Sequence, residues 1–174
     1  MRFSLGYPVM KNRSLRPVQG FTLIEMLVVV ALLGIFLAIA APSFAGLIRS
    51  NKVQAAADEL VTVLQYARSE AITRGVTVTL TADSATTWNA GFNITAAGQI
   101  LRRIDAGGLQ SGITVSSGAA QASFSATGTT GGTTSQCFTL CPADQAGQCR
   151  FVGVSVTGRI TPPSIDRPLT GECT

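Results

Sequence analysis

Hydrophobic and polar positions divide the chain into an uncharged stretch, an amphipathic stretch and a region of short alternating segments. From Phe21 to Ala41 the only charge is Glu25, and a helix of this length can cross a membrane. After Pro42, apolar residues recur at helical spacing along one face. We therefore predict one helix over Phe21–Arg74, kinked or loosened at Pro42, whose amphipathic face packs on a following sheet. The residues of that face are Val53, Ala57, Leu60, Leu64, Ala67 and Ala71.

Alternation of β-branched and polar residues after the helix predicts a region of short strands. The pairs Asp83-Ser84, Ala97-Gly98 and Gly107-Gly108 are turn signals between them, and the Gly/Thr-rich segment Gly128–Ser135 is expected to be a flexible loop. Charged residues are sparse, at 13%, which also favours a loop-rich β domain. The predicted strands are Val76–Ala82, Trp88–Ile94, Gln99–Ile104, Ile113–Ser117, Ala122–Ser125, Gln136–Leu140 and Arg150–Thr157.

The formal net charge of +4 belongs to the amino-terminal arm. Residues 1–20 contain four basic residues and no acid, whereas the remainder contains 9 basic and 9 acidic residues. The basic excess of the whole chain therefore gives no support for nucleic-acid binding. Positive residues stay on the cytoplasmic side of a first membrane segment, so everything after Pro42 is expected outside the cytoplasm.

All four cysteines lie in the last quarter of the chain, at Cys137, Cys141, Cys149 and Cys173. An even number in an exported domain indicates disulfides, and the absence of histidine and of any CxxC spacing argues against zinc. The sequence does not choose among the three pairings. Our preferred hypothesis joins Cys141 to Cys149 across a short loop and Cys137 to Cys173, which would pin the tail to the sheet.

The amino-terminal apolar segment has two interpretations. A secretory signal peptide would have a basic start, an apolar core and a small-residue cleavage site, and Ala38-Ile39-Ala40 fits such a site. The uncharged run from Met26 to Ala41 is slightly longer than usual for a signal peptide, and that interpretation does not require Glu25.

The second interpretation follows from the segment Gly20-Phe21-Thr22-Leu23-Ile24-Glu25, which resembles the cleavage motif of type IV pilins and type II secretion pseudopilins. The resemblance implies that a prepilin peptidase cuts after Gly20 and methylates the new N-terminal Phe21. It also implies that Glu25 meets the N-terminal amine of a neighbouring subunit as helices bundle into a fibre. The helix dipole alone would favour an anion there by about 0.3–1 kcal/mol, but it does not account for the adjacent glycine and phenylalanine.

This resemblance implies that the chain is divided into four parts. Residues 1–20 are a cytoplasmic leader that is removed, 21–41 the transmembrane half of the helix, and 42–75 its amphipathic half. Residues 76–174 are a periplasmic β domain with a disulfide-rich end. The expected location is a single pass through the inner membrane, followed by incorporation into a pilus or pseudopilus fibre.

Several later segments resemble one branch of the superfamily, the GspH/FimT/FimU group of minor pilins and pseudopilins. These segments are LVTVLQYARSEAITRGVTVTL, WNAGFNI, ILRRID, ASFSATGTT and VGVSVTGRI, so the resemblance extends from Gly20 to about Ile160. It implies an α+β fold, with a long N-terminal helix packed on an antiparallel β-sheet. It implies as partners the prepilin peptidase, the inner membrane, and other minor pilins and the major pilin through their N-terminal helices.

Three functions remain open. The first is that of a minor pilin in the tip or priming complex that initiates a type IV pilus. The second, which is related, is that of a type II secretion pseudopilin in the GspH role. The third is DNA binding, since some FimT-type members use a C-terminal stretch similar to Gly-Arg-x-Arg. Here Gly158-Arg159-Ile160-Thr161 lacks the second arginine, although Arg150 and Arg167 are near in sequence. We do not favour DNA as a partner, because affinity rises with the number of phosphates neutralised.

Enzymatic chemistry is not expected. The chain has no histidine, so neither a Ser/His/Asp nor a Cys/His arrangement can form. Phosphate-binding glycine loops are also missing from the sequence, and its carboxylates are scattered. We therefore expect no catalytic residue, no cofactor and no metal.

Overall fold

The computed structural model describes residues 20–132, 135–144 and 148–166. The chain divides into two compact units, residues 1–41 and residues 42–174, which we describe separately. Among the described residues, the first contains the beginning of a helix, and the second contains the rest of that helix and the strands.

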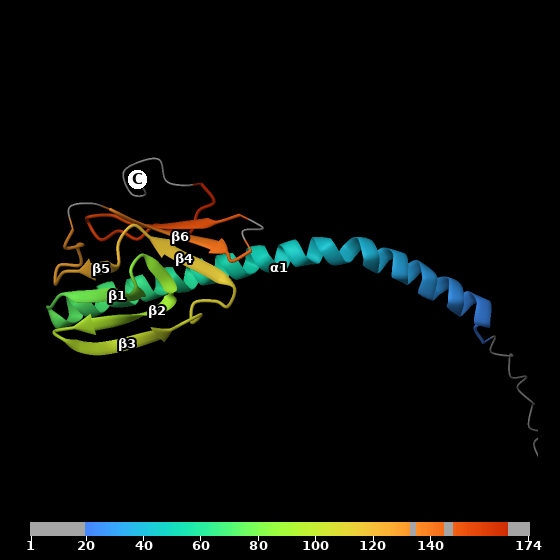
Figure 1. The fold of residues 1–174 in the computed structure, drawn as a ribbon, viewed down its shortest axis with the longest axis horizontal. Coiled ribbons are helices and arrows are strands. Elements are labelled where there is room, and N and C mark those ends of the chain that lie inside the picture. The colour runs from blue at the N-terminus through green and yellow to red at the C-terminus, as the bar shows by residue number, and fades with distance from the viewer. Residues whose placement is uncertain (1–19, 133–134, 145–147, 167–174) are drawn as a thin grey trace, which may run out of the picture. The chain divides into compact units, whose positions relative to one another are not determined.

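The one long helix, α1, comprises Leu23–Arg74 (Figure 1). It ends with Arg74 paired to Glu70 at 2.5 Å, and Gly75 follows with φ +65°, the left-handed conformation typical of the residue after a helix. The helix continues through Pro42, whose side chain lies outside the described residues, and the kink at this position stays a prediction.

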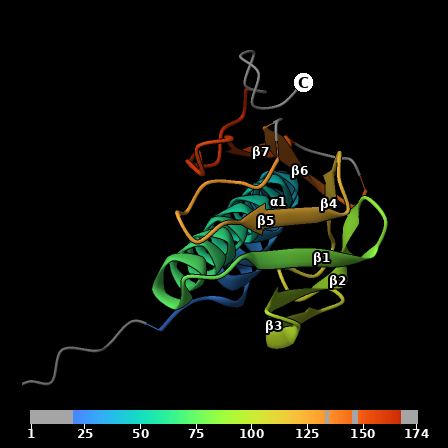
Figure 2. The same cartoon turned by 90° about the vertical axis from the view of Figure 1, so that its left-hand side faces the viewer.

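The predicted amphipathic face of α1 is confirmed. All six of its residues are at most 1% exposed and belong to the hydrophobic core of the second unit. Ala56 and Val63 are buried on the same side of the helix. This face packs against the sheet, which runs alongside the second half of α1 (Figure 2).

Seven strands form one sheet in which every paired neighbour is antiparallel. Their order is β5-β1-β2-β4-β6-β7, and β3 pairs with β2 beside this path. The predicted α+β class, a long N-terminal helix on an antiparallel sheet, is therefore present. The strands are β1 (Val78–Ser84), β2 (Thr87–Ala96), β3 (Gln99–Asp105), β4 (Ile113–Ser117), β5 (Gln121–Phe124), β6 (Gln136–Pro142) and β7 (Arg150–Val154).

Strand β2 pairs with two different strands along one of its edges. It pairs with β4 through Thr87 and with β3 from Gly91 onward. Gly91 has φ +111°, and a Cβ atom there would lie 2.8 Å from the carboxylate of Asp83. Only glycine fits both the backbone conformation and the close approach at this point of the sheet.

Three aromatic side chains of the core, Trp88, Phe92 and Phe138, lie close to one another. Trp88 is 5.4 Å from Phe92 and 5.0 Å from Phe138, measured between ring centroids, and the second pair is edge-to-face. The indole nitrogen of Trp88 donates a 3.1 Å hydrogen bond to the carbonyl oxygen of Ala119, so this buried side chain keeps its polar atom satisfied.

Only β4 has the predicted bounds, and the other strands differ from the prediction by one to three residues at one or both ends. Two of these differences have a clear cause. β1 extends through Ser84, which we expected in a turn, because Ser84 still pairs with Thr87 and the chain reverses at Ala85, with φ 30°. β7 ends at Val154, earlier than predicted, because the next residue enters a turn in which Ser155 N donates to the carbonyl oxygen of Arg159 at 2.9 Å.

The Gly/Thr-rich segment is more ordered than expected where it is described. Thr129 and Thr130 are hydrogen-bonded to Ser125 and Val156, and Thr130 bridges to Phe124. The chain after β7 also lies on the sheet, through bridges that join Phe151 to Ser164 and Val154 to Ile160. Backbone hydrogen bonds therefore hold both segments.

Replacing Leu64 by alanine should destabilise the second unit by about 2–5 kcal/mol, because Leu64 is completely buried between helix and sheet. Leu47→Ala, an identical change on the exposed part of the same helix, should cost less than about 0.5 kcal/mol. Chemical denaturation of residues 42–174 measures both. Equal losses would contradict the assigned packing.

Candidate functional site

The amino-terminal segment starts with a capped helix. Gly20, Phe21 and Thr22 precede α1, and the hydroxyl oxygen of Thr22 accepts a 3.2 Å hydrogen bond from the backbone N–H of Glu25. The carbonyl oxygen of Thr22 accepts another from Met26 N at 3.2 Å. Thr22 is therefore the N-cap residue, and its side chain satisfies one of the amides that a helix start leaves unpaired.

This cap corrects the predicted start of the helix. We expected α1 from Phe21, but it begins at Leu23, since the N-cap residue itself is outside the regular helical conformation. The sequence analysis overlooked Thr22, although Thr-x-x-Glu is the pattern of a capping box. Glu25 thus occupies the third position of the helix, where the dipole favours its carboxylate.

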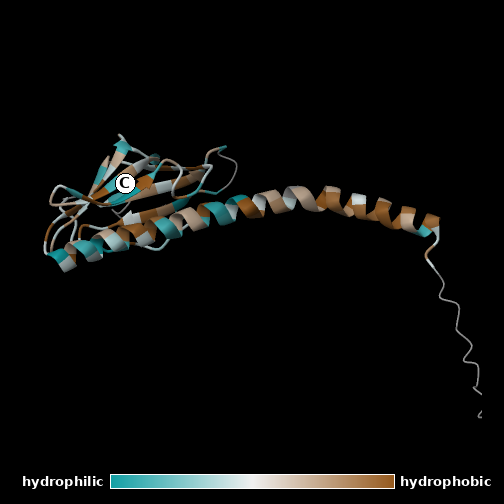
Figure 3. Cartoon of the chain, turned by 90° about the horizontal axis from the view of Figure 1, so that it is seen from below, coloured by the Kyte–Doolittle hydropathy of each residue, from teal (hydrophilic) through white to brown (hydrophobic). Residues whose placement is uncertain are grey.

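The side chains around Glu25 are apolar and uncovered in the described structure. Phe21 is 74% exposed and Leu23 82%, and large apolar residues more than 40% exposed continue to Ile48. In Figure 3 the ribbon of the first half of α1 carries mainly the colour of hydrophobic residues. By length and composition this part of α1 could cross a membrane. Glu25 is its only charged side chain.

The second group of predicted site residues does not come together. Arg150 begins β7 opposite Leu140, whereas Arg159 lies in the turn after β7, beside Ser155. At about 3.3 Å per residue, β7 spans about 13 Å from Arg150 to Val154, and Arg159 lies in the turn beyond that end. Arg167 lies outside the described residues. The two described arginines therefore form no compact cationic patch of the kind that gives strong phosphate binding.

The turn that carries Arg159 is tightly packed. Gly158 has φ +77°, and a Cβ atom there would overlap the carbonyl oxygen of Gly128. That oxygen also accepts a 2.9 Å hydrogen bond from Arg68 Nε. Gly158 thus has a structural role in packing this turn near the end of α1, and that role does not depend on the function of Arg159.

The predicted bond between Cys141 and Cys149 is present. Cys137 is also disulfide-bonded, and its expected partner, Cys173, lies outside the described residues. The first disulfide joins the end of β6 to the residue before β7, which fixes the connection between two paired strands.

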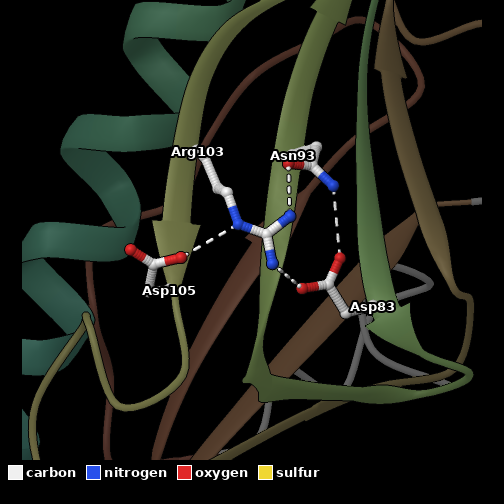
Figure 4. A network of polar contacts seen from close by, with 4 residues as sticks. All are labelled: Asp83, Asn93, Arg103 and Asp105. Atoms are coloured by element: carbon white, nitrogen blue, oxygen red, sulfur yellow. Dashed lines mark hydrogen bonds and ion pairs between the residues drawn. The ribbon is translucent and has the colours of Figure 1, made fainter.

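A polar network that the sequence analysis did not predict joins three strands (Figure 4). Arg103 contacts Asp83 and Asp105, both at 2.9 Å, and donates to Asn93 Oδ1 at 3.1 Å. The hydrogen bond to Asp105 and the charge of Asp83 raise the pKa of Arg103 above its usual value. The side chains of Arg103 and Asp105 are more than half exposed, so these ion pairs contribute little to the stability of the fold.

Comparisons with known protein families agree with the helix start and the sheet. Residues 56–158, more than half of the chain, match the family described as type II transport protein GspH. Residues 15–41 match the prokaryotic N-terminal methylation motif. The chain therefore belongs to the GspH family, whose fold is that of structural pilins.

Among solved structures, the chain is similar to the type IV minor pilin FimU of Pseudomonas aeruginosa (strain PAO1). One FimU crystal form is 27% identical at a TM-score of 0.58, covering 70% of this chain and 96% of that chain. A second form is 28% identical at a TM-score of 0.56, covering 68% and 98%. A search of curated proteins found no match. Family, motif and fold together define a type IV pilin-like minor pilin or pseudopilin.

Gly158→Ala should destabilise the second unit by at least about 1 kcal/mol more than Gly107→Ala. Both glycines have positive φ, +77° and +75°, so both variants suffer backbone strain, but only at Gly158 would a Cβ overlap another backbone atom. Thermal unfolding of the two variants gives the difference. Equal melting temperatures would contradict the close packing of this turn.

Proposed function

We propose that this protein is incorporated as a minor pilin into a type IV pilus, in the tip or priming complex that initiates the fibre. The observation that carries this proposal is the likeness to FimU, a type IV minor pilin, over 96% of the FimU chain. The N-terminal methylation motif supports it, because a chain processed in this way keeps its apolar helix. We infer that the prepilin peptidase cuts after Gly20 and methylates Phe21.

The proposed mechanism is helix bundling. While the protein is in the bilayer, lipid covers the exposed apolar residues between Phe21 and Ile48. On assembly, helices of other minor pilins and of the major pilin replace the lipid, so the apolar surface stays out of water. Because Thr22 caps the helix, Phe21 lies outside it. The amine that cleavage creates on Phe21 can then pair with the carboxylate of a neighbouring subunit.

Glu25 supplies that carboxylate. A charge within the bilayer centre costs about 2.5–3.5 kcal/mol on insertion scales and less near the interface. Because Glu25 is the only charge of the apolar segment, pairing it with the methylated amine of another subunit fixes the axial register of two helices. The basic residues before Gly20 favour a cytoplasmic leader and a periplasmic C-terminal unit.

The alternative within the same class is a pseudopilin of type II secretion. The description of the matching family favours it, since that family is the type II transport protein GspH. The two roles use the same helix chemistry. The two roles can be distinguished by neighbouring genes and by phenotype. Loss of a pilus component removes surface fibres, whereas loss of a secretion component leaves exported proteins in the periplasm.

DNA binding is a weaker alternative. The Gly158-Arg159 pair supports it, but Thr161 stands where the related pattern has a second arginine. Separation of Arg150 from Arg159 by the length of β7 also leaves few cations for one stretch of phosphates.

Glu25→Ala should leave leader cleavage intact and lower incorporation into fibres by at least about tenfold, because it removes a charge-assisted contact. Gly20→Val should block cleavage itself. Immunoblotting of cell membranes reads the cleavage, and immunoblotting of sheared fibres reads the incorporation. Glu59→Ala, on the same helix within the second unit, is the matched control. Normal incorporation of Glu25→Ala would refute the role given to this carboxylate.

If the DNA alternative were correct, Arg159→Gln would weaken a salt-dependent mobility shift of the purified processed chain. We expect instead no shift at low salt for either protein, since one arginine neutralises too few phosphates. Binding by the original protein that Arg159→Gln abolishes would reverse this ranking.

A further inference from the structure

A small hollow lies within the second unit, between α1, the segment before β4 and the segment after β6. Its volume is about 270 Å³, slightly below the usual range of roughly 300–1,000 Å³ for pockets that hold small molecules. The hollow therefore suits a group about as large as a lipid headgroup. Residues of three elements line it: Arg49, Lys52, Ser111, Gly112, Ile113, Pro142, Ala143 and Asp144.

The hollow carries a net positive charge. Helix α1 contributes two cations, Arg49 and Lys52, and Asp144 is the single carboxylate in the lining. Arg49 Nε lies 3.3 Å from Asp144 Oδ2, and both side chains are about half exposed, at 47% and 50%. An exposed pair of this kind is weak, and the guanidinium has donors beyond Nε, so Arg49 can bind a second anion.

The walls of the hollow are held in place without a ligand. Ala143 N donates to the carbonyl oxygen of Gly112 at 2.9 Å, which joins the two loops to each other. The disulfide between Cys141 and Cys149 anchors the chain directly before Pro142. A site whose walls are already fixed loses little conformational freedom on binding.

The position of the two cations along the chain indicates which anion they meet. Arg49 is the first charged residue after Glu25, and every residue from Met26 to Ile48 is uncharged. At about 1.5 Å per residue, a helix of this length exceeds the hydrocarbon core of about 30 Å. Cations that follow such a run lie at the level of the lipid headgroups.

We propose that the hollow at Arg49 and Lys52 binds the phosphate of an anionic phospholipid headgroup while the protein is anchored in the membrane. Arg49 and Lys52 hold the phosphate oxygens of the headgroup. The proposal depends on the membrane anchoring assumed under the proposed function. Transfer into a fibre then requires that this lipid be released.

Substitution of Asp144 distinguishes this proposal from a purely structural role of its ion pair with Arg49. If Arg49 only fastened a loop to the helix, Asp144→Asn would loosen the loop and bring no gain. If the hollow binds phosphate, Asp144→Asn removes a competing anion and should strengthen lipid retention about two- to fivefold.

The test uses the full processed chain, purified in a mild non-ionic detergent and supplied with either phosphatidylglycerol or phosphatidylcholine. Native mass spectrometry gives the ratio of lipid-bound to lipid-free chain. We expect retention of one phosphatidylglycerol under conditions that remove phosphatidylcholine. The double variant Arg49→Gln/Lys52→Gln should retain phosphatidylglycerol at least about tenfold less.

Arg102→Gln is the matched control, because Arg102 is an exposed cation on β3 that does not line the hollow. Its lipid retention should equal that of the original protein. Circular dichroism of each variant confirms that the fold is intact. A parallel sample with inorganic phosphate in place of lipid tests the source of the anion, and phosphate adducts that equal the lipid adducts would overturn a lipid site.

Two further results would overturn the proposal. One is equal retention of the two lipids. The other is unchanged retention by the double variant together with its loss from fibres, which would assign the cations to an acidic side chain of another pilin. Alkaline extraction of cell membranes separately tests the anchoring, so a chain that is anchored but shows no lipid preference refutes the headgroup site alone.

Discussion

The fold depends on one contact, the apolar stripe of α1 against the sheet. Four alanines, Ala56, Ala57, Ala67 and Ala71, are fully buried there. Leu60 and Leu64 are buried on the same helix, and they belong to one core cluster with aromatic residues of the sheet. Without the other, the helix and the sheet would each expose an apolar face to water. The stability of the sheet therefore depends on its contact with the helix.

The same helix meets a different constraint before Pro42. There apolar residues occur on every side, and no strand of the described structure covers them. A helix that is hydrophobic all round is stable only in lipid or among other apolar helices. One continuous element therefore combines a half that completes its own domain with a half that requires surroundings supplied from outside, which is the physical basis of a pilin-like protein.

Periodicity made most of the fold predictable. The buried face of α1 and all seven strands were anticipated, because burial on one side leaves a regular spacing in the sequence. Contacts between distant residues leave no such spacing. The Arg103 network joins positions 20 residues apart, and the Gly158–Gly128 contact depends on two turns meeting. Sequence proximity also suggested that Arg150 and Arg159 belong together, whereas Arg150 begins β7 and Arg159 lies in the turn beyond its other end.

Two edge strands of the described sheet, β7 and β3, are shielded from pairing with another molecule. The chain after β7 covers that strand through its bridges at Ser164 and Ile160, and β3 carries exposed charges at Arg102, Arg103 and Asp105. Covered or charged edges resist the addition of strands from another molecule. A second copy of the chain is thus discouraged from adding a strand at either of these two edges.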